Sequence, residues 1–214
     1  MRTLWRSVVQ PQQDYASQLW APVGLRGDLQ LQEAPLRAFT KRARGLRDLP
    51  YWERLRAMGL SSTERRNDRY RVIYTWKVLV GLVPNCGIFL SDRQDTRRGT
   101  LAAIPSLSGS RQAVVTLREH SLLTEGPRLF NSLPPSLRRL DWSLNTFKAH
   151  LDRYLQTLPD MPYTPGLPTA ATDCKGVQSN SLRDWAHATK RDPSLFLCPG
   201  ALTEGVTTAD IYNE

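Results

Sequence analysis

Four prolines within residues 159–168 divide this chain of 214 residues into two parts of different character. Proline has no backbone N–H to donate and disfavours helical geometry in the residue before it, so no regular helix is expected to cross this segment. The residues that follow are rich in Thr, Ala, Ser and Asn and show no sustained hydrophobic period. The pattern predicts one folded domain over residues 1–158 and a largely disordered tail over residues 159–214.

Helical periodicity dominates the part of the chain that precedes these prolines. Apolar residues recur there at intervals of three or four positions, which is typical of helices with one buried face. The expected helices cover residues 2–20, 28–44, 50–58, 62–80, 128–133 and 144–158. Pro11 is expected to kink or break the first helix. Pro35 lies inside the second, where it should cost about 3 kcal/mol.

Polar residues and glycines predict where several of these helices begin and end. Ser61 and Glu64 have the spacing of a capping box at the start of the helix over 62–80. Single N-cap residues are expected for three other helices, and glycine terminators for two. These residues are Asp28, Asp48, Ser143, Gly59 and Gly81.

Residues 85–126 are less regular than the rest of the predicted domain. Two short runs, 113–117 and 121–124, have the composition of strands and predict a small β-hairpin. Gly126-Pro127 is expected to form a turn, and Pro134-Pro135 to end the short helix after it. The expected fold class is therefore mainly α: a single helical domain with a small β-hairpin and a disordered C-terminal tail.

The cysteines and the hydropathy pattern indicate an intracellular protein. Cys86, Cys174 and Cys198 lie far apart and have no metal-ligand spacing, so neither a disulfide framework nor a zinc site is expected. No window approaches the roughly 18 apolar residues of a membrane-spanning helix. The first ten residues lack the apolar stretch of a secretory signal. The pattern does not distinguish a nuclear from a cytoplasmic location, and no membrane association is expected.

Motifs for catalysis are absent from the sequence. It has no adjacent acidic residues and no D-x-D, whereas a two-metal site needs converging carboxylates to hold its ions. It also has no phosphate-binding P-loop and no nucleophile elbow. His120, His150 and Cys86 are isolated, and structural roles are favoured for all three. We therefore expect no catalytic residues, no metal and no cofactor.

Arginine supplies most of the positive charge. The chain has a formal net charge of +9, with 24 arginines and 5 lysines. Residues 37–77 alone contain twelve basic and four acidic side chains. Arginine binds phosphate through two parallel hydrogen bonds and stacks on bases, which favours a polyanionic partner such as RNA or DNA. A solvated surface that serves solubility, or one that meets an acidic protein, is the alternative.

Aromatic residues alternate with these basic residues. A basic surface with aromatic platforms suits single-stranded nucleic acid, because bases stack while cations follow the phosphates. At helical spacing the same aromatics are also expected in the core, and for Trp52 and Trp76 the core is favoured. The candidate phosphate contacts are Arg65, Arg66, Arg69 and Arg71, with Arg42 and Arg44 as secondary candidates.

Seven short segments form a distinctive series when they are taken in order. The first is WRSVVQPQQDYASQLWAP at residues 5–22, and the last two are GPRLFNSLP at 126–134 and NTFK followed by LD at 145–152. Between them lie FTK, GLRDLPYWERL, the RR and YRVIYTWK pair, and GLVPN, all within residues 39–85. In combination, over about residues 3–185, they resemble the C-terminal region of jockey-like non-LTR retrotransposon reverse transcriptases.

This resemblance implies a helical, non-catalytic fragment. In that family the polymerase palm and the endonuclease lie upstream of the region these segments resemble, so no family catalytic residue maps onto this chain. The C-terminal region is thought to help hold template RNA or target DNA, which would suit the arginine cluster. Two alternatives stay open. One is a docking module whose exposed apolar faces pack on the reverse transcriptase body or on a second copy; the other is a truncated element copy with no selected function.

Overall fold

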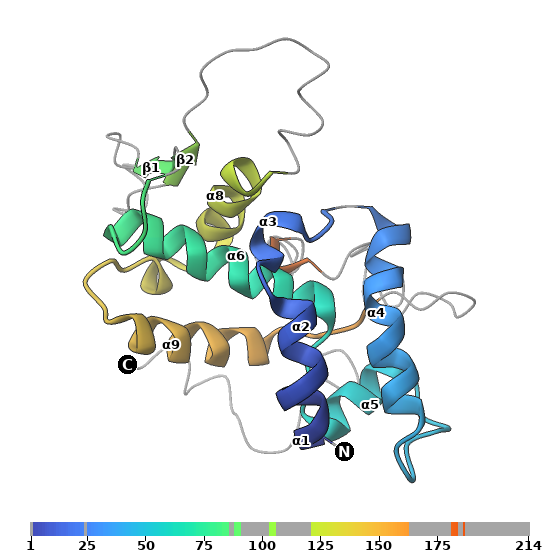
Figure 1. Ribbon diagram of the computed structural model, residues 1–214. Helices are drawn as coiled ribbons and strands as arrows, with labels where there is room; N and C mark the ends of the chain where they lie inside the picture. The colour runs from blue at the N-terminus through green and yellow to red at the C-terminus, as the bar shows by residue number, and fades with distance from the viewer. Residues whose placement is uncertain are drawn as a thin grey trace.

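The computed structural model describes residues 2–23, 25–85, 88–90, 103–105, 121–162, 181–183 and 186. They are mainly helical, which confirms the predicted fold class (Figure 1). In chain order the elements are α1 (Arg2–Leu4), the π-helical turn η1 (Trp5–Val9), α2 (Gln10–Asp14), α3 (Ser17–Trp20), α4 (Arg26–Lys41), α5 (Tyr51–Met58), α6 (Thr63–Val80), β1 (Ile88–Leu90), β2 (Ala103–Pro105), α8 (Leu122–Ser132), the 3₁₀ turn η3 (Pro135–Leu137) and α9 (Leu144–Thr157). Within the described residues, no helix combines the length and the apolar character that crossing a membrane requires.

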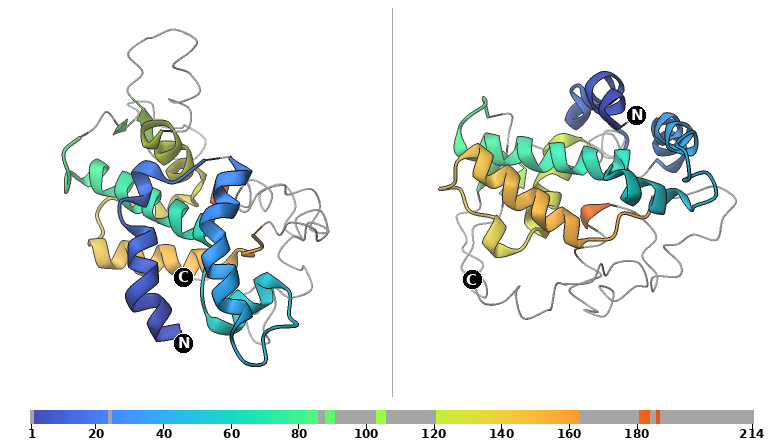
Figure 2. Two further views of the ribbon diagram at one scale, coloured as in Figure 1. Left: turned by 45° about the vertical axis from the view of Figure 1, so that its right-hand side comes forward. Right: turned by 90° about the horizontal axis from the view of Figure 1, so that it is seen from below.

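Helix α6 is the element around which the other helices pack. It contacts α3, α4, α8 and α9. Figure 2 shows it between the N-terminal helices and α9. Its N-cap is Ser62, whose Oγ accepts a hydrogen bond from the Arg65 backbone N–H at 3.2 Å, so the predicted capping box of Ser61 and Glu64 is one residue too early. Gly81 ends the helix with a φ of 80°, as predicted.

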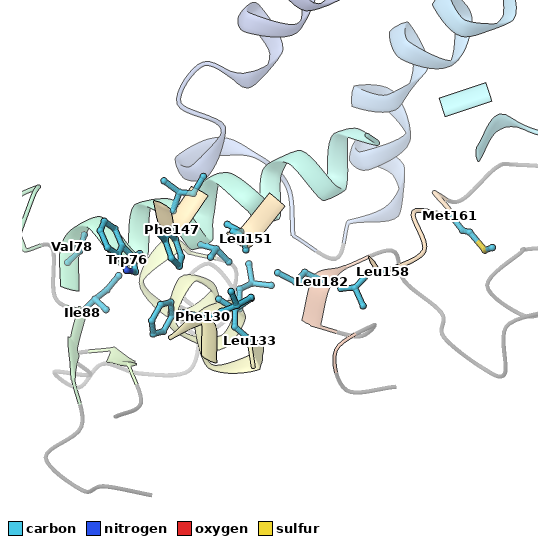
Figure 3. Close-up of a cluster of buried hydrophobic side chains, with 14 residues drawn as sticks. Trp76, Val78, Ile88, Phe130, Leu133, Phe147, Leu151, Leu158, Met161 and Leu182 are labelled. Atoms are coloured by element: carbon cyan, nitrogen blue, oxygen red, sulfur yellow. The ribbon is translucent and has the colours of Figure 1, made fainter. Parts of the chain in front are cut away.

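The larger hydrophobic core lies between α6, α8 and α9 (Figure 3). Trp76 stacks on Phe147 with ring centroids 4.8 Å apart, and its Nε1 donates a hydrogen bond of 2.9 Å to the Arg139 carbonyl. Other fully buried members are Leu129, Phe130, Leu133, Leu151 and Leu182. Burial of each such side chain stabilises the fold by about 1.5–3 kcal/mol.

A smaller core joins the N-terminal helices to α4 and α5. Its buried members are Trp5, Leu36, Tyr51, Leu55, Met58 and Leu60. Trp5 packs on Phe39 with ring centroids 4.8 Å apart. The buried Glu33 carboxylate accepts hydrogen bonds from the Tyr51 hydroxyl and from the Thr63 backbone N–H at 2.7 Å, which ties α4 to the starts of α5 and α6.

The N-terminal helices differ from the prediction in where the break lies. Pro11 does not break the helix: the chain stays helical from the π-helical turn at Trp5–Val9 through α2. The chain breaks instead at Ala16, which adopts left-handed geometry with a φ of 51°. Helix α4 begins at Arg26, so Asp28 lies in its first turn rather than at its N-cap. Pro35 stands within α4, which continues through it.

Helices α5 and α8 show two further corrections. Pro50, not Asp48, is the N-cap of α5, whereas Gly59 ends that helix as predicted. Helix α8 passes through Gly126-Pro127, where a turn was expected, and its first residues cover the predicted strand 121–124. A Cβ at Gly126 would lie 2.4 Å from the Thr75 Oγ1, so this glycine permits the close approach of α8 to α6.

The described sheet is a two-stranded antiparallel pair of β1 and β2. Phe89 stands opposite Ile104 in its register. The predicted hairpin partner at 113–117 lies outside the described residues, so the observed pair is a different one. Ile88 connects this sheet to the larger core.

Segments beyond the predicted domain boundary also belong to the packed structure. Asp160 accepts hydrogen bonds from the Ser62 N–H and hydroxyl at 2.7 and 2.6 Å, and Met161 is buried. Leu182 is fully buried, and its N–H donates to the Asp68 Oδ2 at 2.7 Å. A boundary at residue 158 is therefore too early for 159–162 and 181–183. Most of the predicted tail lies outside the described residues.

Candidate nucleic-acid interface

Three of the four arginines predicted on α6 are buried. Arg65, Arg66 and Arg71 have relative exposures of 3%, 5% and 4%. They lie on sides of α6 that other elements cover, because this helix is packed against neighbours in several directions. The predicted arginine-rich solvent face of α6 is therefore wrong for these three residues.

Arg66 and Arg71 attach the N-terminal helices to α6. The Arg66 Nε pairs with Asp14 at 3.0 Å, and its Nη1 donates to the Ser61 carbonyl at 2.8 Å. The Arg71 Nη2 donates to the Ala21 carbonyl at 2.5 Å, and its Nη1 lies 3.4 Å from the Asp68 carboxylate. Burial raises the pKa of Asp68, although Arg71 acts in the opposite direction. Both arginines stabilise the fold.

Arg69 connects α6 to α9 and remains partly accessible. Its Nε and Nη2 donate to the two oxygens of Asp152 at 2.5 and 2.8 Å. This bidentate geometry raises the pKa of Arg69. The Arg69 side chain is 25% exposed. A ligand that approaches α6 therefore meets an arginine that is already oriented by a carboxylate.

Arg65 differs from the other three in that two of its buried guanidinium nitrogens lack a hydrogen-bond partner among the described residues. Its Nη2 donates to the Pro159 carbonyl at 2.6 Å. In the part of the chain that the structure describes, no group accepts a hydrogen bond from its Nε or Nη1. Both nitrogens are buried, and a buried charged donor without an acceptor is destabilising.

Arg65, Arg66 and Arg69 meet two further arginines in a cleft of about 700 Å³. Residues of the N-terminal helices, of α5, of the start of α6 and of the end of α9 form its walls. The two further arginines are Arg6 and Arg56, and the carboxylates in the lining are Asp152 and Asp160. Five arginines and two carboxylates give the cleft a positive potential that favours anions.

Two aromatic side chains line the same cleft. Trp52 and Tyr70 are partly exposed there. The Tyr70 hydroxyl donates to Asp14 at 3.0 Å, and the Arg69 guanidinium lies 5.7 Å from its ring centroid. Trp76 is buried in the larger core, as the helical spacing favoured, and Trp52 packs partly buried against the same core. Tyr51 is buried in the smaller core.

Arg42 and Arg44 lie apart from this cleft. Both are exposed in the segment that follows α4, and neither belongs to the cleft lining. The structure therefore does not unite the six candidate arginines in one surface. The sequence analysis missed Arg6 as a site residue, although it stands next to Trp5 in the first family-like segment. Arg56 lay within the basic stretch but was not singled out.

Of the isolated residues considered for catalysis, His150 is in the described part of the chain, and it does not line the cleft. His150 stacks on Trp142 with ring centroids 4.5 Å apart, at the boundary of the larger core. Cys86 and His120 lie outside the described residues. Among the residues that are described, no three His, Cys, Asp or Glu side chains come together in a way that would hold a metal ion.

Comparison of the chain with protein-family models, with curated proteins and with solved structures found no match.

Proposed function

We propose that this protein is a non-catalytic nucleic-acid-binding protein that holds RNA or DNA in the arginine-lined cleft. One observation carries the proposal: five arginines from three parts of the chain line one cleft together with Trp52 and Tyr70. Guanidinium groups bind phosphate oxygens, and aromatic rings stack on bases. The cleft therefore offers both chemistries that a nucleotide chain needs.

The size of the cleft favours a single strand over a duplex. Its volume of about 700 Å³ lies in the range of sites that enclose small molecules, roughly 300–1,000 Å³. A few nucleotides with unstacked bases fit such a space, whereas the bases of a duplex stay paired and cannot reach Trp52 or Tyr70. Duplex DNA is accordingly expected to bind more weakly than single-stranded RNA or DNA.

The resemblance to the C-terminal region of jockey-like reverse transcriptases supports the same proposal. A fragment of such a polyprotein would hold template RNA or target DNA without performing the chemistry itself. We propose an intracellular location for this role, because both nucleic acids are found there. The residues proposed to contact nucleic acid are Arg6, Arg56, Arg65 and Arg69, with Arg42 and Arg44 as a separate exposed pair.

The test is a fluorescence anisotropy titration of the full chain with labelled single-stranded RNA, single-stranded DNA and duplex DNA over a salt series. Phosphate contacts release counterions, so the logarithm of affinity should fall linearly with the logarithm of salt concentration. The double variant Arg6→Gln/Arg56→Gln should bind at least tenfold more weakly. Its matched control, Arg47→Gln/Arg153→Gln, removes two exposed positive charges outside the cleft and should change affinity less than threefold. Absence of binding by folded protein at low salt would refute the proposal.

A specific observation favours a second candidate function, docking to a protein. Large apolar side chains on the N-terminal helices and α4 are exposed: Leu4 59%, Tyr15 80%, Leu19 66%, Trp20 51% and Leu31 74%. Exposed apolar patches mark interaction surfaces. Docking through these side chains, to a reverse transcriptase body or to a second copy, would be much less sensitive to salt than nucleic-acid binding. Sedimentation at low and high salt distinguishes the two.

A further inference from the structure

Arg2 and Arg6 lie together at the C-terminal end of α5. They stand four positions apart in the continuous helical run of α1 and η1, so their side chains leave the same side of that run. Trp5, between them in the chain, is buried in the smaller core and fixes the run on the domain. Both arginine side chains are exposed. Their common contact is Gly59, the residue at which α5 ends.

The absence of a side chain at Gly59 allows the Arg2 guanidinium to lie against the end of α5. A Cβ at this position would lie 3.2 Å from the Cζ and the Nη2 of Arg2 and 3.3 Å from its Nη1. These nearly equal distances mean that the flat face of the guanidinium rests on Gly59. Its N–H groups lie in the plane of the group, so they point sideways and not into the glycine. The Arg6 guanidinium is fixed at the same residue, because its Nη2 donates to the Gly59 carbonyl at 2.7 Å.

The charges of these two guanidinium groups are not neutralised by the part of the chain that the structure describes. Within that part, neither Arg2 nor Arg6 forms an ion pair, whereas Arg66 and Arg69 each pair with a carboxylate. Arg56, in the last turn of α5, adds a further positive charge nearby. Two like charges held at one residue repel each other, and an anion between them replaces this repulsion with attraction.

The pair stands at the edge of the arginine-lined cleft. Arg6 and Gly59 belong to the cleft lining, and Arg2 adjoins the lining at Gly59. Trp52 and Arg56 of α5 also line the cleft, and their spacing of four residues places them on one side of that helix. At about 1.5 Å per residue, Trp52 and Gly59 are about 10 Å apart along α5. A base that stacks on Trp52 and a phosphate at the pair can therefore belong to the same strand.

We propose that Arg2 and Arg6 form a clamp that binds one backbone phosphate of the nucleic-acid strand at the edge of the cleft. The inference rests on the proposed function, to which it adds Arg2, a residue outside the cleft lining, and Gly59 as a positioning residue. A phosphodiester has two free oxygens, and guanidinium groups on either side can donate to both. Both arginines are exposed, so the phosphate reaches them without entering the interior of the domain.

The experiment compares Arg2→Gln, Arg6→Gln and the double variant, with labelled single-stranded RNA titrated by the full chain over a salt series. A clamp needs both arginines, so each single variant should bind about tenfold more weakly and the double variant hardly more weakly than either. The slope of log affinity against log salt should decrease by about 1 in the double variant, because one phosphate is lost. Effects that multiply, with a slope lower by about 2, indicate contacts with two separate phosphates and overturn the clamp.

Gly59→Ala tests the positioning role of the glycine. The added Cβ displaces the Arg2 guanidinium, so RNA binding should weaken about as much as in Arg2→Gln. In the Arg2→Gln background the same substitution should have little further effect. An equal loss in both backgrounds means that Gly59→Ala acts through the backbone, whose φ there is 58°, and overturns the positioning role. The arginine variants keep the clamp testable even where Gly59→Ala fails to fold by circular dichroism.

The control and the wild type separate the clamp from the proposed function. Arg47→Gln/Arg153→Gln removes the same charge outside the cleft, and a loss as large as that of the double variant would make the effect one of net charge and overturn the clamp. If Arg2→Gln binds RNA as tightly as the wild type, the clamp is overturned and nucleic-acid binding stands. If the folded wild type binds no RNA or DNA at low salt, nucleic-acid binding is overturned, and the clamp with it.

Discussion

Residues 41–47 and 65–71 each contain four basic side chains in seven positions, yet the fold places them in opposite environments. The basic residues of 41–47 are all exposed in the segment at and after the end of α4. In 65–71, three arginines are buried and the fourth is paired with α9. The difference depends on acceptors from distant parts of the chain, such as Asp14, Ala21, Asp152 and the Pro159 carbonyl. Charge density alone therefore does not identify a surface.

The largest expected effect is the loss of stability when a buried arginine of α6 is removed. Arg71→Met leaves the buried carboxylate of Asp68 without its cation and the Ala21 carbonyl without its donor. We expect a loss of about 3–5 kcal/mol in the free energy of unfolding, measured by urea denaturation. The double variant Arg71→Met/Asp68→Asn should recover part of this loss, because it removes the uncompensated charge. A loss below about 1 kcal/mol would contradict the structural role of Arg71.

A smaller effect is expected for the ion pair of Arg69 and Asp152, whose side chains are 25% and 42% exposed. Pairs that are partly solvated contribute little, so a double-mutant cycle with Arg69→Gln and Asp152→Asn should give a coupling of about 1 kcal/mol. The coupling should decrease at high salt concentration, whereas the effect of Arg71→Met should not. If the Arg71–Asp68 and Arg69–Asp152 pairs gave equal coupling energies, the distinction between a buried and an accessible arginine on α6 would be contradicted.

Protonation of the acidic neighbours adds a pH dependence to the buried region. Burial, together with the nearby Asp68 and Asp160, raises the pKa of Glu64 to about 8. The folded protein therefore holds this proton at pH values where the unfolded chain, with a pKa near 4.5, has lost it. Stability should fall as pH rises from about 4.5 to 8. In Glu64→Gln the midpoint of urea unfolding should vary less with pH over this window. If the midpoint of the variant changes with pH as steeply as that of the wild type, the raised pKa of Glu64 is contradicted.

The sequence predicted local features of this fold better than tertiary ones. The hydrophobic period predicted the helices, Ser143 was placed correctly as N-cap of α9, and Gly59 and Gly81 end their helices as expected. Gly126 was misread as a turn residue, since nothing local reveals that Thr75 approaches it. The role of Asp160 at the N-terminus of α6 was also invisible, because its partner Ser62 lies 98 residues away.

The residues of the candidate site were also only partly predictable from the sequence, for a different reason. A helix that is buried on several sides has no single apolar stripe, so the pattern of α6 does not indicate which arginines face solvent. The convergence of Arg6, Arg56 and Arg65 depends on how the N-terminal helices, α5 and α6 pack together. Composition predicted an arginine-rich binding region; only the packing identifies the cleft.

The smallest expected effect on stability is that of replacing arginines in the exposed residues 41–47, which tests the other half of the comparison with residues 65–71. Arg42→Gln/Arg44→Gln changes two exposed side chains, and we expect a change of less than about 0.5 kcal/mol in the free energy of unfolding. If these residues bind phosphates outside the cleft, the slope of log affinity against log salt should decrease by about 1 for each phosphate that the variant no longer binds. If the slope is unchanged, residues 41–47 supply solubility, and nucleic-acid binding resides in the cleft, where burial and pairing have fixed the arginines in place.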